Sequence, residues 1–163
     1  MSRAETESRS AKGGRGSPRM EMWIWLFPAT YVLHIIEEYR GGFHLWLSRV
    51  AGVDLSREDF LAINVIALVV MTAGTAFAWV GVAPGLPSAF ATVITINGLL
   101  HLSGSLLTQS YSPGVVTGML LWLPLGVYGL RRSRRELALA QFAGGVIIGV
   151  LLHVLVSAIA LLS

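Results

Sequence analysis

The sequence predicts an all-α integral membrane protein, a bundle of about five transmembrane helices. Hydrophobic residues make up 54% of its 163 residues, and charged residues make up only 13%. A soluble domain carries roughly 25% charged residues, so this composition favours a surface that faces lipid. The apolar residues also gather in runs of about 20, the length at which a helix crosses the hydrocarbon of a bilayer. Length and composition together indicate one transmembrane domain over residues 21–163.

Residues 1–20 differ in composition from the rest of the chain. They are polar, rich in Gly and Ser, and of mixed charge with a basic excess, so they cannot bury enough apolar surface to become ordered. We expect a disordered basic tail rather than a signal peptide, because the polar stretch is too long and the first apolar run extends too far. The net charge of +3 does not predict nucleic-acid binding, because the basic residues stand at the ends of apolar runs.

The first two spans are bounded by recognisable signals. Residues 22–39 begin with tryptophans suited to the membrane interface and end before two consecutive glycines, which commonly stop helices. Residues 43–50 predict a short helix lying in the interface. Ser56, followed three residues later by Asp59, is a capping signal, and it predicts that a second span occupies residues 60–82.

Three further apolar runs complete the predicted bundle: residues 88–107, 115–130 and 137–162. Turns rich in Pro and Gly precede the first two of these runs, and a short basic loop at 131–135 precedes the last. The last run contains Gly145 and Gly149, a spacing that lets helices approach closely. We interpret this spacing as packing within the bundle rather than as a dimerisation motif.

The basic residues predict the orientation, because cytoplasmic segments of membrane proteins collect Lys and Arg. The tail at 1–20 and the loop at 131–135 are the most basic segments, and five spans place them on the same side of the membrane. We therefore expect the N-terminus in the cytoplasm, the C-terminus outside, and the cell membrane as the location. The oligomeric state stays open.

Ionisable side chains inside the predicted spans are the strongest functional signal, because burying them in hydrocarbon is expensive. His34 lies three and four residues before Glu37 and Glu38, so the three side chains share one face of a helix. Asn97 and His101 are four residues apart and share a face of the third span in the same way. These two faces are the candidate site.

A third imidazole, His153, lies in the last span. Measured from the middle of their spans, His34, His101 and His153 each lie about 5 Å toward the outer side. Glu37 and Glu38 lie roughly 5 Å further out. Three helices can therefore present imidazoles at one level of the bundle, with the two carboxylates close by.

Imidazole nitrogens and carboxylates are ligands for Zn and Fe. We therefore expect a metal site drawn from His34, Glu37, Glu38, His101 and His153. A metal there would polarise a carbonyl or activate water. Without a metal, the same groups form an acid–base pair that could protonate an alkene or move a double bond in a lipid. The structural alternative is a hydrogen-bonded network that joins the spans, and it suits the isolated His153 best.

The chain resembles the HXXEE membrane protein family, which is described by three short motifs. The His34 segment carries His-x-x-Glu-Glu, Asn97 and His101 form Asn-x-x-x-His, and Tyr111 begins Tyr-x-Pro-Gly. The resemblance covers about residues 25–130 and implies a helical membrane protein without an established activity. It also implies that one set of residues acts together as a catalytic group: His34, Glu37, Glu38, Asn97, His101 and Tyr111. The family motifs do not include His153.

Two classes of function follow from these observations. The first is an intramembrane enzyme, metal-dependent or acid–base, that acts on a lipid or isoprenoid-like small molecule entering from the bilayer. The second is a non-catalytic membrane protein: a small transporter, a proton path or an assembly subunit. Five spans without an inverted repeat argue against a secondary transporter. Membrane lipid is the expected partner in either case.

Overall fold

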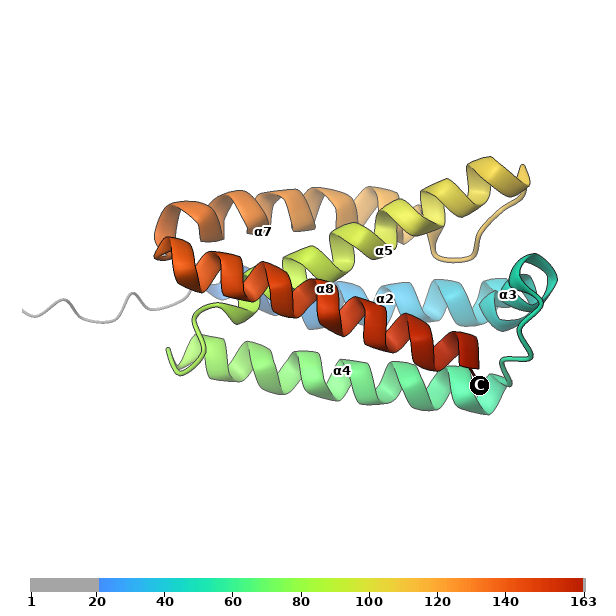
Figure 1. Ribbon diagram of the computed structural model, residues 1–163, viewed down its shortest axis with the longest axis horizontal. Coiled ribbons are helices and arrows are strands. Elements are labelled where there is room, and N and C mark those ends of the chain that lie inside the picture. Colours follow the sequence, from blue (N-terminus) through green and yellow to red (C-terminus); the bar gives the residue numbers. More distant parts are fainter. Residues whose placement is uncertain (1–20, 163) are drawn as a thin grey trace, which may run out of the picture.

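The computed structural model describes residues 21–162, and within that range every regular element is a helix. The predicted tail at 1–20 lies outside the described residues. The helices follow one another as η1 (Met22–Trp25), α2 (Leu26–Gly41), α3 (Phe43–Ala51), α4 (Arg57–Trp79), α5 (Leu86–Thr108), α6 (Val115–Thr117), η2 (Gly118–Trp122), α7 (Leu123–Glu136) and α8 (Leu139–Leu162). Helices α2, α4, α5, α7 and α8 run along the long axis of the molecule and alternate in direction (Figure 1).

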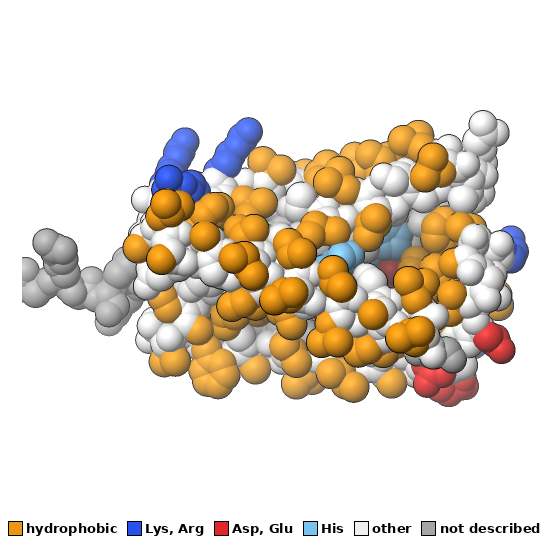
Figure 2. Space-filling model, viewed as in Figure 1, with side chains coloured by type: hydrophobic (Ala, Val, Ile, Leu, Met, Phe, Trp, Pro, Cys, Tyr) orange, Lys and Arg blue, Asp and Glu red, His pale blue; other side chains and the backbone are white. Residues whose placement is uncertain are grey.

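The helices have the surface of a membrane protein. Three of them, α4, α5 and α8, are long and apolar enough to cross a membrane. Hydrophobic side chains cover the middle of the molecule, and charged side chains gather at its two ends (Figure 2). The prediction of an all-α fold is confirmed for the described residues, with three helices that could span a membrane, while the count of about five crossings stays a prediction.

Most helix boundaries follow the signals in the sequence. Ser56 caps α4, since its hydroxyl oxygen accepts a hydrogen bond from the backbone N–H of Asp59 at 3.0 Å. Gly42 ends α2 with a left-handed φ of 71°, which glycine adopts without strain. The predicted loop at 131–135 is wrong, because α7 continues through it to Glu136. The Arg132 guanidinium lies 2.6 Å from the Glu136 carboxylate one turn later, an i,i+4 pair that favours the helix.

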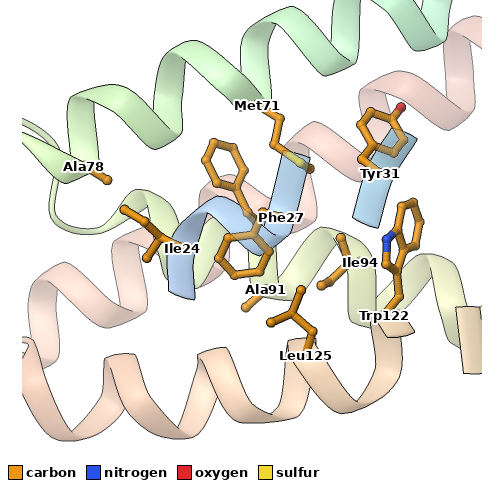
Figure 3. Packing of buried hydrophobic residues seen from close by; sticks show 10 residues of the cluster. Ile24, Phe27, Tyr31, Met71, Ala78, Ala91, Ile94, Trp122 and Leu125 are labelled. Carbon is orange, nitrogen blue, oxygen red and sulfur yellow. The ribbon is translucent and has the colours of Figure 1, made fainter. Parts of the chain in front are cut away.

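The hydrophobic core lies between α2, α4, α5 and α7 (Figure 3). Phe27 and Tyr31 point inward from α2, and Met71 reaches them from α4 (Figure 3). Ile94 of α5 and Trp122 of η2 close the other side. Helix α8 contributes no residue to this described cluster, so it lies on the bundle as an outer helix.

Helix α8 packs against α5 through glycines. A Cβ added at Gly145 would lie 2.0 Å from the Ser88 hydroxyl oxygen and 2.3 Å from the Gly85 carbonyl oxygen. A Cβ at Gly149 would lie 2.4 Å from the Ala89 carbonyl oxygen. The small-residue spacing therefore serves a contact between two helices of the same chain, as interpreted from the sequence.

We expect Gly145→Ala to destabilise the bundle by about 1–3 kcal/mol, because the added methyl group overpacks a rigid backbone contact. Thermal unfolding in detergent micelles measures the effect. Gly144→Ala is the matched control, because a Cβ at Gly144 meets nothing within 4 Å. Equal stability of the two variants would contradict the close approach of α5 and α8.

Candidate metal centre

Three of the predicted ionisable side chains meet inside the bundle. His34 and Glu38 project from successive turns of α2, and His101 faces them from α5. The Glu38 Oε1 atom lies 3.2 Å from Nε2 of His101 and 3.5 Å from Nε2 of His34. The side chains are buried, with exposed fractions of 0% for His34, 5% for Glu38 and 4% for His101. One donor atom from each residue lies within 4.8 Å of the other two, a grouping that could hold a metal ion.

Glu37 turns away from this group and binds the start of the next helical segment. Its Oε1 atom accepts hydrogen bonds from the Tyr111 hydroxyl at 2.6 Å and from the backbone N–H groups of Gly114 and Val116. Its Oε2 atom accepts from the backbone N–H and the hydroxyl of Thr117 at 2.7 and 2.5 Å. Backbone N–H groups at a helix start have no partners within the helix, and an anion is stabilised there. Glu37 thus ties α2 to α6.

The loop from Tyr111 to Gly114 packs against the His101 side of the cluster formed by His34, Glu38 and His101. Ser112 places its hydroxyl oxygen 3.1 Å from Nδ1 of His101. Gly114 has a left-handed φ of 103°, and a Cβ there would lie 2.6 Å from Cε1 of His101, so both backbone and space require glycine. Burial and the hydrogen bond to Glu37 raise the pKa of Tyr111 to about 12, as expected for a hydroxyl that donates to an ionised carboxylate.

A family model described as a protein of unknown function with an HXXEE motif matches residues 25–129, more than half of the chain. The chain belongs to the HXXEE family. No curated protein and no solved structure matches the chain in the corresponding comparisons.

The two glutamates of the HXXEE motif therefore do different work. The second, Glu38, lies between the imidazoles of His34 and His101, whereas the first, Glu37, holds the loop that packs against His101. Adjacent residues on a helix point about 100° apart, so one motif can serve both places. The functional roles of these residues stay predictions.

Thr117 fixes the tautomer of the HXXEE histidine. An ionised carboxylate only accepts hydrogen bonds, so the Thr117 hydroxyl donates its proton to Glu37. The same hydroxyl oxygen lies 2.7 Å from Nδ1 of His34 and must accept the N–H of that nitrogen. In a neutral imidazole the other nitrogen, Nε2, then carries the lone pair. That nitrogen is buried and has no hydrogen-bond partner in the described part of the chain.

A cavity of about 480 Å³ adjoins the group, within the size range of small-molecule sites. Glu38 and His101 form part of its wall, and most of the remaining lining is hydrophobic. Figure 2 shows histidine and acidic atoms inside a hollow of a mainly hydrophobic face. Asn97 and His153 also line the cavity. The group of described residues that could hold a metal ion does not include Glu37 or His153, although the sequence-based set contained both.

Sequence reasoning missed three residues that shape the site: Ser112, Thr117 and Trp122. The Trp122 ring stacks on the His34 imidazole with centroids 3.6 Å apart. It ends η2, a π-helical turn, and such turns occur frequently at functional sites. Ser112 lies within the Tyr-x-Pro-Gly motif, which was a usable signal. Thr117 and Trp122 lie beyond the motifs, in a run whose composition is ordinary for a membrane span.

Proposed function

We propose that this HXXEE protein is an intramembrane metal-dependent enzyme that acts on a lipid or isoprenoid-like substrate. One Zn or Fe ion is held by Nε2 of His34, Nε2 of His101 and the Glu38 carboxylate. The observation that carries this proposal is the orientation of Nε2 of His34. This nitrogen has no hydrogen-bond partner in the described chain and lies 3.5 Å from Oε1 of Glu38, so in the neutral imidazole a lone pair faces a negative oxygen inside a buried site.

A cation between these atoms relieves that repulsion. Two ligands each about 2.1 Å from a tetrahedral ion lie about 3.4 Å apart. The distances of 3.2 and 3.5 Å from Oε1 of Glu38 to the two Nε2 atoms match this spacing. Two imidazoles and one carboxylate form the ligand set of several catalytic zinc sites and of non-haem iron oxygenases. These sets leave a coordination position open, where a metal can polarise a substrate oxygen or activate water.

The other ring nitrogens of the two histidines support the same assignment. Nδ1 of His34 is bound to Thr117, and Nδ1 of His101 to Ser112. Metal-bound imidazoles usually engage their second nitrogen in this way, which fixes the ring and raises its basicity. Glu37 and Tyr111 act through Thr117 as positioning residues, while Asn97 and His153 face the substrate cavity.

Access to the cavity supports a substrate that comes from the bilayer. Ile66 and Val70 of α4 line the cavity and are also exposed on the outer surface, as is Leu155 of α8. The cavity therefore opens sideways between α4 and α8, onto a surface that faces lipid. An apolar molecule can reach it without leaving the hydrocarbon.

The proposal includes five crossings of the cell membrane, with a cytoplasmic N-terminus and an external C-terminus. The alternation of α2, α4, α5, α7 and α8 along one axis (Figure 1) supports five crossings. The arginines at 131–135 follow the last apolar turns of α7, and basic residues favour the cytoplasmic side.

Metal-free acid–base catalysis is the second candidate, favoured by the 3.2 Å separation of Glu38 Oε1 and His101 Nε2. This is hydrogen-bonding distance, so the two groups can share a proton. A carboxylate and an imidazole paired in this way can protonate an alkene or shift a double bond.

Lipid turnover tests the proposal. Purified protein in vesicles is incubated with a membrane lipid extract, and products are identified by mass spectrometry. We expect a product that disappears after treatment with a strong chelator and returns when Zn or Fe is added. A product unaffected by complete metal removal would favour the acid–base alternative. A metal-free protein without any product would contradict both.

A further inference from the structure

One buried hydrogen-bond donor beside the candidate metal centre has no protein partner. Trp122 is only 1% exposed, and its indole Nε1 is buried without an acceptor among the described residues. Buried donors are nearly always paired, because leaving one unpaired forfeits its hydrogen bond to water. A buried unpaired donor beside a cavity therefore indicates a partner that comes from outside the protein.

The surroundings of Trp122 hold this donor in a fixed direction. The indole stacks on the His34 imidazole at 3.6 Å and lies beside the Tyr31 ring, with centroids 5.5 Å apart. Figure 3 shows its nitrogen on the side that faces Ile94 and Met71 rather than the outside of the bundle. Tyr31, Met71 and Trp122 all line the 480 Å³ cavity. Trp122 thus belongs to the wall of the cavity that contains Glu38 and His101.

The cavity wall also restricts the charge of the ligand. No Lys or Arg is found among the described residues that line the cavity. Phosphate recognition relies on such cations, above all arginine. A second neutral group is present, because the Asn97 amide lines the cavity and makes no hydrogen bond within the described chain. The described protein groups therefore suit a neutral oxygen, and the cation that a phosphate could contact here is the proposed metal, a case that the phosphate probe below tests.

We propose that the Trp122 indole N–H binds a neutral oxygen of the substrate, which is therefore an apolar chain or ring bearing an alcohol, carbonyl or ester group. This assignment rests on the proposed function and names its substrate class: a neutral oxygenated lipid, neither a pure hydrocarbon nor a phospholipid headgroup. An indole N–H only donates hydrogen bonds, so the ligand atom must be an acceptor. The stack with His34 places that acceptor beside the ligands of the proposed metal.

Photolabelling of the purified full-length protein tests this substrate class. The probes are a diazirine-bearing long-chain alcohol, the same chain without oxygen, and its phosphate monoester. We expect wild-type protein to favour the alcohol over the other two. Trp122→Phe keeps the stack on His34 and removes the donor, so it should weaken alcohol labelling roughly 3- to 10-fold and leave hydrocarbon labelling unchanged.

Trp23→Phe is the matched control. The Trp23 indole nitrogen is also buried and unpartnered, but Trp23 is not part of the cavity wall. This variant should label like the wild type. Equal labelling of alcohol and hydrocarbon by the wild type, or an alcohol preference that survives in Trp122→Phe, would overturn the proposal.

Nuclear magnetic resonance of the wild type keeps the test decisive if a variant does not fold. In protein labelled with ¹⁵N-tryptophan, the indole N–H signal that shifts most on adding the alcohol should belong to Trp122. An unshifted Trp122 signal at saturating alcohol would contradict the assignment. Metal content is measured on the same samples. Failure of the metal proposal is then distinguished from failure of the oxygen-binding proposal.

Discussion

His101→Ala should strip the purified protein of a bound metal ion that the wild type carries at one equivalent. Removing Nε2 of His101 takes away one of three ligand atoms. Loss of a group that merely supports a ligand weakens metal binding 10- to 100-fold, so loss of a ligand itself should weaken it at least about 100-fold. Elemental analysis of protein purified without added chelator measures the stoichiometry.

His153→Ala is the matched control for this experiment. Both imidazoles line the same cavity, but His153 lies outside the proposed metal-binding group. The control should therefore keep its metal. Helical circular dichroism and gel filtration establish that both variants are folded. A wild-type protein that holds no Zn or Fe, or an equal metal loss in both variants, would refute the three-ligand site.

Glu37→Ala should lower the free energy of unfolding by about 3 kcal/mol, because hydrogen bonds to a charged group are worth about 1.5–3 kcal/mol each. The carboxylate accepts from three backbone N–H groups and two hydroxyls, but two of these bonds are exposed, so water can replace the carboxylate there and the net loss is far smaller than the sum of the five bonds. The change also frees Thr117, so we expect metal affinity to fall 10- to 100-fold. Unfolding in mixed micelles and metal titration measure the two effects.

Glu58→Ala is the control for Glu37→Ala, and Glu38→Gln tests the second glutamate of the motif. Glu58→Ala removes an exposed carboxylate from the first turn of α4 and should change stability by no more than about 0.5 kcal/mol. Glu38→Gln should abolish metal binding while keeping stability close to that of the wild type, because a neutral amide is cheaper to bury than an unpaired charge. If Glu37→Ala is as stable as Glu58→Ala, the carboxylate does not anchor the loop.

Helical spacing predicted part of the site well. The pairs His34 with Glu38 and Asn97 with His101 are four residues apart, so each shares a helix face whatever the tertiary structure. The meeting of α2 and α5 required only that buried polar groups find partners. Spacing could not predict that Glu37 and Glu38 make different contacts. Those contacts depend on where the segment after Pro113 packs against α2.

The sequence could not predict how far each helix lies from the centre of the bundle. His153 has a depth similar to that of His34 by counting residues, but depth does not say how far α8 stands from the centre of the bundle. That distance is set by the contact of Gly145 and Gly149 with α5. The fourth span was expected as one regular helix, yet it contains the π-helical turn that carries Trp122. No residue pattern in the sequence predicts that turn.

The division of the ligands between two distant segments has a consequence for biogenesis. Glu38 and His101 are separated in the chain by the whole of α3 and α4, and the loop holding His101 in place follows later still. A nascent chain has no complete coordination sphere until α5 has been inserted and the Tyr111–Gly114 loop has closed on Glu37. Metal binding at the proposed site should therefore follow insertion of α5 and closure of this loop, and it would indicate that these segments have come together on α2.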